Sequence, residues 1–192
     1  MKGKWAEGIE PRNFAWVIKD SLAVCERPGG YGEHHRRVRR QEEIIWVRQN
    51  HFDVLYSLIA GSHNLHNYEE LGMPFRHRPW PAHDQLAQYM EVLFTEIQGA
   101  MTAGLQVLVH KEEVGERLCG LMAAYLLWAG LVQTGPQVTA LAERIFQQRL
   151  GPHGRELVEI AVGMEHQHED TSKCTNNPTV IASNFEDSVL SA

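Results

Sequence analysis

Residues 106–120, QVLVHKEEVGERLCG, contain the pattern that decides the fold. A short apolar run ends at His110 and Lys111, and an almost wholly apolar segment begins at Leu118. The first run predicts a buried strand and the second a buried helix. The connecting residues 110–117 then form a tight turn from strand to helix, which is the layout of an anion-binding loop. A lysine and several glutamates in that turn raise the question of what it binds.

Strands and helices are predicted to alternate along most of the chain. Apolar runs predict strands within 14–25, over 53–60, over 75–80 and over 105–110. Helical spacing and end signals predict helices over 37–51, 67–71, 84–104, 118–132, 134–151 and 155–164, with Asp84 beginning one, Thr134 capping another and Gly151 ending it. This alternation predicts an α/β fold of three layers, with a mostly parallel central sheet flanked by helices. Loop 110–117 then lies beyond the carboxyl end of a central strand, where such sheets bind ligands.

Length and composition limit the possible classes of protein. The 192 residues suit one domain, expected over 1–165, and the polar residues 166–192 predict a flexible C-terminal tail. A net charge of −6 argues against binding to nucleic acid or a membrane surface. A basic run, Arg36, Arg37, Arg39 and Arg40, is interpreted as a solvated helix face because two glutamates follow it.

The cysteines and the N-terminal residues bear on location and cofactors. The three cysteines, Cys25, Cys119 and Cys174, have spacings that suit neither a disulfide framework nor a zinc site. The N-terminal residues lack the apolar core of a secretory signal, and the apolar segment 118–132 is too short to span a membrane. We therefore expect a cytoplasmic protein with no metal and no cofactor.

The chain from about residue 17 to 160 resembles the cysteine-dependent protein tyrosine and dual-specificity phosphatases in their small single-domain form. SLAVCERP at 21–28 resembles the family's opening strand and Arg-Pro turn. Residues 52–84 resemble its second strand, short helix and the loop that carries an acidic residue. Residues 107–131 resemble its strand, phosphate loop and central helix. The resemblance implies the same fold and places the active site at loop 110–117.

The family's loop reads His-Cys, five residues, then Arg, and an upstream aspartate protonates the leaving group. Matched position by position, the resemblance implies that His110 and Arg117 are the loop histidine and arginine, and that Asp84 is the candidate acid. Lys111 stands at the position of the cysteine nucleophile. The chain is thus expected to be an atypical member with lysine in place of the catalytic cysteine.

Three departures argue against the family's reaction. A protonated lysine at 111 has no free electron pair with which to attack phosphorus. Val114 and Glu116 stand where the family has glycines, so the amide cradle is expected to change shape. Glu112, Glu113 and Glu116 bring negative charge to a site whose parent chemistry binds a dianion, each repulsion being on the order of 4 kcal/mol at close range. Ordinary phosphatase activity is therefore not expected.

Three functions remain open. The first is a pseudophosphatase-like binding or regulatory protein, whose partner is an anionic or zwitterionic small molecule at loop 110–117 or another protein. The second is a repurposed enzyme acting on a small, for example cationic, metabolite, and the third is a residual phosphohydrolase. The candidate catalytic residues are Lys111, Asp84 and Glu113. The candidate ligand-binding residues are His110, Glu112, Gly115, Glu116, Arg117 and His63.

Each candidate also has a purely structural interpretation. Lys111 is expected either to plug the pocket through a salt bridge to a nearby acid or to act as an imine-forming or basic amine. Asp84 is either a general acid or the N-cap of its helix. The loop glutamates either select a cation or stabilise a helix N-terminus. His110 fits a packed, hydrogen-bonded histidine, and Cys119 fits a small core residue.

Overall fold

The computed structural model describes residues 8–30, 36–62 and 64–164. His63 and the predicted tail 166–192 lie outside the described residues. The strands are β1 (Ala15–Ile18), β2 (Leu22–Glu26), β3 (Val54–Ser57), β4 (Phe75–His77) and β5 (Val107–Lys111). The helices are α1 (Arg37–Gln49), α2 (His66–Glu70), the 3-10 turn η2 (His83–Gln85), α3 (Leu86–Thr102), α4 (Glu116–Trp128), α5 (Gly135–Phe146) and α6 (Pro152–Val162).

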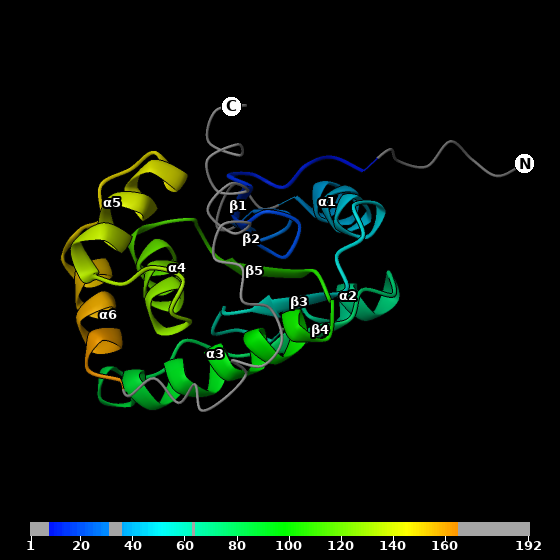
Figure 1. Ribbon diagram of the computed structural model, residues 1–192. Coiled ribbons are helices and arrows are strands. Elements are labelled where there is room, and N and C mark those ends of the chain that lie inside the picture. Colours follow the sequence, from blue (N-terminus) through cyan, green and yellow to red (C-terminus); the bar gives the residue numbers. More distant parts are fainter. Residues whose placement is uncertain (1–7, 31–35, 63, 165–192) are drawn as a thin grey trace, which may run out of the picture.

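The described strands form one mixed sheet in the order β1-β2-β5-β3-β4, and only β1 is antiparallel to its neighbour. Helices α1 and α2 pack on one face of this sheet, and α3 to α6 pack on the other (Figure 1). The predicted three-layer α/β architecture is thereby confirmed. No helix of the described part is long and apolar enough to cross a membrane.

The central strand β5 sends its side chains alternately to the two helical layers. Val107 and Val109 belong to the core under α3 and α4, whereas Leu108 belongs to the core under α1 and α2. Side chains of successive strand residues point to opposite faces, so the two residues that end β5 also diverge. His110 faces the α1 and α2 layer, and Lys111 faces the opposite layer. This alternation separates two polar regions that are adjacent in sequence.

Two predicted helix ends are wrong. Asp84 neither begins nor caps α3: it lies in the 3-10 turn, and α3 starts at Leu86, the first residue there that is buried in the core. Gly151 does not end α5, because Gln147 adopts a left-handed conformation (φ 51°) four residues earlier. Gly151 instead precedes α6 as its N-cap residue. The prediction for Thr134 is confirmed, since its side chain accepts a hydrogen bond from the backbone N–H of Gln137.

Helix α4 is buried from residue 118 to 128, between the sheet and helices α5 and α6. It approaches α6 so closely that the two backbones meet at Gly120 and Gly154. A β-carbon on Gly120 would lie 2.4 Å from the Cα atom of Gly154, which is far inside van der Waals contact. The pair of glycines therefore sets the distance between the helix that follows the loop and the helix beside it.

The glycine contact gives a direct test of this packing. We expect Gly120→Ala to lower the free energy of unfolding by about 1–3 kcal/mol, because the added methyl group forces α4 and α6 apart. Urea denaturation measures the change. Gly99→Ala is the matched control, since Gly99 is exposed in α3 and an added β-carbon meets nothing within 4 Å. The control is expected to gain about 1 kcal/mol of stability from helix propensity; equal effects of both substitutions would contradict the close packing.

Candidate functional site

The loop between β5 and α4 opens onto a depression of about 260 Å³. Its lining residues are Lys111, Glu113, Gly115, Glu116, Arg117, Leu118 and His153. A second depression, of about 100 Å³, is lined by Trp80, Pro81, His83, Leu86, Arg117, His153, Glu156 and Leu157. Because Arg117 and His153 line both, the two depressions adjoin along one groove. The structure thus brings together most of the loop residues that the sequence predicts as a site.

Lys111 lines this groove and is held on two sides. Its Nζ atom is 2.9 Å from Glu112 Oε2 and forms an ion pair there. The same atom lies 5.8 Å from the centre of the Trp80 ring, within the range of a cation–π contact. Only 18% of the Lys111 side chain is exposed. The ammonium group is thereby both charge-paired and partly covered.

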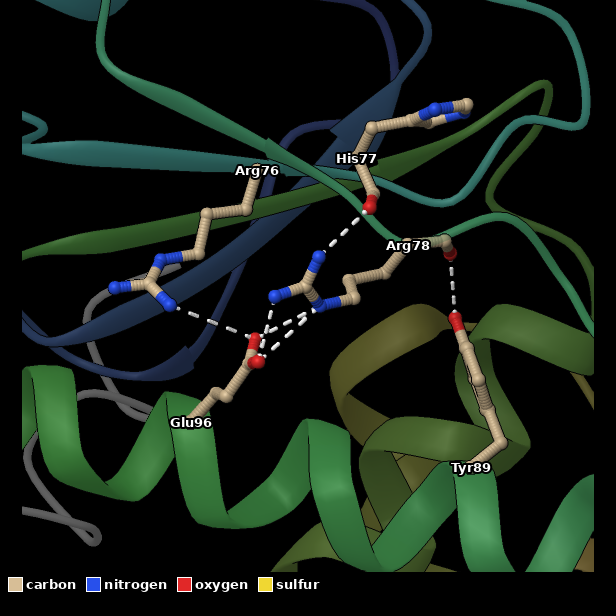
Figure 2. A network of polar contacts seen from close by, with 5 residues as sticks. All are labelled: Arg76, His77, Arg78, Tyr89 and Glu96. Carbon is tan, nitrogen blue, oxygen red and sulfur yellow. Dashed lines mark hydrogen bonds and ion pairs between the residues drawn. The ribbon is translucent and has the colours of Figure 1, made fainter.

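The segment that carries Trp80 is anchored on α3 by the network in Figure 2. The Arg78 guanidinium donates to both carboxylate oxygens of Glu96, at 2.6 Å from Nη2 and 3.0 Å from Nε. Tyr89 donates its hydroxyl to the backbone carbonyl of Arg78 at 2.7 Å, and Arg76 adds a longer ion pair to Glu96 at 3.8 Å. Trp80 follows Arg78 by two residues. The contacts that α3 makes with Arg78 therefore help to hold Trp80 against Lys111.

Glu116 begins α4, but its carboxylate turns to the N-terminus of α6. Oε1 accepts a hydrogen bond from the backbone N–H of Gly154 at 3.1 Å, and Oε2 lies 3.7 Å from His153 Nδ1. The hydrogen bond from Gly154 lowers the pKa of this carboxyl group. Gly151 makes room for it, because a β-carbon there would lie 2.6 Å from the Glu116 carboxyl carbon. Glu116 therefore caps a neighbouring helix.

The remaining loop charges, Glu113 and Arg117, are exposed. Glu113 folds over the loop backbone, so that a β-carbon at Gly115 would lie 3.1 Å from Glu113 Oε1. Among the described residues, no hydrogen bond or ion pair engages the guanidinium of Arg117. This arginine is accordingly free to bind a ligand in the groove, while a carboxylate stands nearby.

His110 does not reach the groove. It is fully buried on the other face of the sheet, and its Nε2 lies 2.9 Å from the hydroxyl oxygen of Tyr68. Burial, with a smaller contribution from the charge of Arg27, lowers the pKa of His110 to about 3. A neutral, hydrogen-bonded imidazole in this place supports the end of β5.

Asp84 is exposed in its 3-10 turn and lines neither depression. Four residues that no sequence pattern singled out do line the groove: Trp80, His83, His153 and Glu156. Two of them are paired, with His83 Nε2 at 2.5 Å from Glu156 Oε1. His153 and Glu156 belong to α6, which approaches the loop only through tertiary packing.

The two cysteines in the described part, Cys25 and Cys119, are buried and line neither depression. Burial raises the pKa of the Cys25 thiol, and it raises that of Cys119 to about 11. Gln148 donates its side-chain N–H to Cys119 Sγ at 2.8 Å. Within residues 8–30, 36–62 and 64–164 no group of histidine, cysteine and acidic side chains could hold a metal ion. The groove is thus built from charged and aromatic side chains.

No protein-family profile and no curated protein matches the chain by sequence. By structure it is similar to kinase-associated phosphatase with serine in place of its catalytic-site cysteine (14% identity, TM-score 0.64, covering 77% of this chain and 92% of that one). It is also similar to Tk-PTP in the active form, at 15% identity and a TM-score of 0.62, over 79% of this chain and 98% of that one. A third similar structure is TpbA of P. aeruginosa, at 13% identity and a TM-score of 0.59, over 86% of this chain and 93% of that one. The fold is therefore that of the protein tyrosine and dual-specificity phosphatases.

The cap formed by Glu116 predicts a defined pH dependence. A carboxyl group whose pKa is lowered by folding stabilises the protein fully above its ordinary pKa of 4.5, and the contribution is lost as the pH falls through the folded value. We expect Glu116→Gln to lower the melting temperature at neutral pH, and the difference from the wild type to shrink in acid. Melting curves across this range measure it. Glu159→Gln, an exposed change on α6, is the control; a Glu116→Gln deficit that persists at low pH would contradict the cap.

Proposed function

We propose that this chain is a phosphatase-fold protein that binds a small anionic or zwitterionic ligand at loop 110–117 without carrying out the cysteine-dependent reaction. The observation that supports this proposal most directly is how Lys111 is held, because Lys111 stands where the phosphatases that the chain resembles have their cysteine nucleophile. Its ammonium group is ion-paired with Glu112 and covered by Trp80. The proposal keeps the cytoplasmic location expected from the sequence.

The absence of a nucleophile argues against phosphatase turnover. The family's reaction needs a thiolate at the base of the loop, where a lysine stands instead. Cys119 is on α4 behind the loop, and the raised pKa of its thiol keeps it protonated at neutral pH. Neither it nor Cys25 lines the groove. The scaffold thus retains a binding loop while the covalent step lacks its central group.

The charges around the groove favour an anionic group. Arg117 offers the fork geometry that binds a carboxylate or phosphate group with two parallel hydrogen bonds. Glu116 repels such a group less than the sequence suggested, because its carboxylate is occupied at α6. Glu112 is paired with Lys111.

A second candidate function is hydrolysis by an activated water, which the pair His83–Glu156 favours. A carboxylate 2.5 Å from an imidazole orients it as a general base, and this pair borders the groove next to Arg117. A repurposed enzyme using Lys111 and Asp84 with Glu113 has less support, because Asp84 lines neither depression. Recognition of a protein partner at the same loop remains a further proposal.

Calorimetric titration with tungstate, phosphate and a panel of amino acids tests the binding proposal. We expect at least one of these probes to bind, and Arg117→Ala to weaken it by about tenfold or more through loss of the bidentate contact. Arg155→Ala, an exposed arginine of α6 that lines neither depression, is the matched control. We also expect no turnover of an aryl phosphate.

Three outcomes would decide against the proposal. Aryl phosphate turnover that disappears in His83→Ala would favour the water-based hydrolase. Borohydride trapping of a carbonyl compound that disappears in Lys111→Ala would favour the imine enzyme. Equal binding by the wild type and Arg117→Ala would remove the loop as the ligand site.

A further inference from the structure

A second basic region lies at the N-terminus of α1, on the other face of the sheet from Lys111. The sequence interpretation of its arginines as a solvated face is wrong for Arg40, which is only 5% exposed. The loop after β2 covers this side chain. A β-carbon at Gly29, whose φ is +85°, would lie 2.6 Å from the Arg40 Cβ atom. Only a glycine allows the loop to pass so close.

Two nitrogen atoms of the Arg40 guanidinium are buried and have no hydrogen-bond partner in the described part of the chain. These atoms, Nε and Nη2, are inaccessible to solvent and donate no hydrogen bond to any described residue. A buried donor left unsatisfied loses its hydration and regains nothing, and a buried charge without a counter-ion is costlier still. The nearby carboxylate of Glu43 is committed elsewhere, because it accepts from the Gly29 N–H and from Arg39 Nε, both at 2.6 Å.

The charges that surround Arg40 increase this imbalance. Burial first, then the positive charges of Arg27 and Arg37, lower the pKa of its guanidinium, and the only opposing influence is that of the Tyr68 hydroxyl. Arg37 is exposed at the edge of this group. Arg37 and Arg40 are three residues apart on α1 and so lie on the same face of the helix, where an anion would lower their mutual repulsion.

The backbone of α1 adds a further positive contribution. The first turn of this 13-residue helix contains no acidic residue, and the N-cap residue Arg36 makes no side-chain capping hydrogen bond. A helix N-terminus carries a partial positive charge and favours acidic neighbours. Arginines in this turn are therefore repelled by the helix end instead of being stabilised by it. An oxyanion at this place would compensate both the helix end and the guanidinium groups.

We propose that Arg40 and Arg37, together with the first turn of α1, form a binding site for a compact oxyanion, either a phosphate group or a carboxylate. Arg40 supplies the buried donors, and Arg37 supplies the accessible rim. The site does not rest on the function proposed for loop 110–117. Residues His110 and Lys111 point to opposite faces of the sheet, so the two regions are reached from different sides.

The full-length Arg117→Ala protein serves as the background for the test, because it removes anion binding at the loop. Inorganic phosphate, sulfate and acetate are titrated at constant ionic strength, with chloride as the reference, and binding is followed by calorimetry and melting temperature. We expect phosphate, acetate or both to bind and raise the melting temperature above the chloride value. Binding of phosphate and sulfate without acetate assigns a tetrahedral anion, and binding of acetate assigns a carboxylate.

Substitutions then locate the site. We expect Arg40→Met to weaken binding by about tenfold or more, and to raise the melting temperature in chloride alone, because it removes an unsatisfied buried charge. Arg37→Ala, an exposed change that leaves the core intact, is expected to weaken binding by about threefold to tenfold. Arg155→Ala is the control and should leave binding unchanged.

The proposal is overturned if none of these anions binds more tightly than chloride, or if the Arg37→Ala protein binds as tightly as its parent. Equal binding by Arg40→Met overturns it as well. Should Arg40→Met fail to fold, Arg37→Ala decides by itself. Loss of binding at the loop through Arg117→Ala, with this second site retained, separates the present proposal from the first one.

Discussion

The contact between Gly120 and Gly154 is the constraint on which the candidate site depends. It lets α6 lie directly against α4, and only at that distance can Glu116 reach the backbone N–H of Gly154. The same approach brings His153 and Glu156 to the edge of the loop. The groove lies between residues 80–86, the loop and the start of α6. Its shape thus depends on two glycines in the core that have no side chains to keep α4 and α6 apart.

The alternation of side chains along β5 divides the charged residues between two environments. On the face of α3 to α6, Lys111 and Glu112 neutralise each other, and Glu116 satisfies a helix end. On the face of α1 and α2, His110 is buried and neutral beside Tyr68, and Nε and Nη2 of Arg40 have no hydrogen-bond partner among the described residues. Two consecutive residues of one strand therefore belong to sites of different electrostatic character.

The sequence predicted what local patterns determine. The apolar run before His110 indicated the central strand, and Thr134 indicated a helix start, because both depend on neighbouring residues only. The expectation that Asp84 begins α3 was wrong, since the helix starts at Leu86, where the first side chain is buried in the core. The destination of Glu116 was out of reach, because its partner is 38 residues away in sequence and depends on helix packing. Arg40 looked solvated in a charged run, although the loop after β2 buries it.

The distribution of satisfied and unsatisfied charge indicates where this fold still demands a ligand. In the loop, Glu112 is paired with Lys111 and Glu116 with the N-terminus of α6, so Arg117 is the charge there that a ligand would pair. Near α1, no described group neutralises Arg40, and an unsatisfied buried donor costs about 1–3 kcal/mol. Proteins are only marginally stable, so an internal cost of this size is retained more readily when it prepares a binding site. The unpaired arginine therefore argues for a functional anion on the face of the sheet opposite the loop.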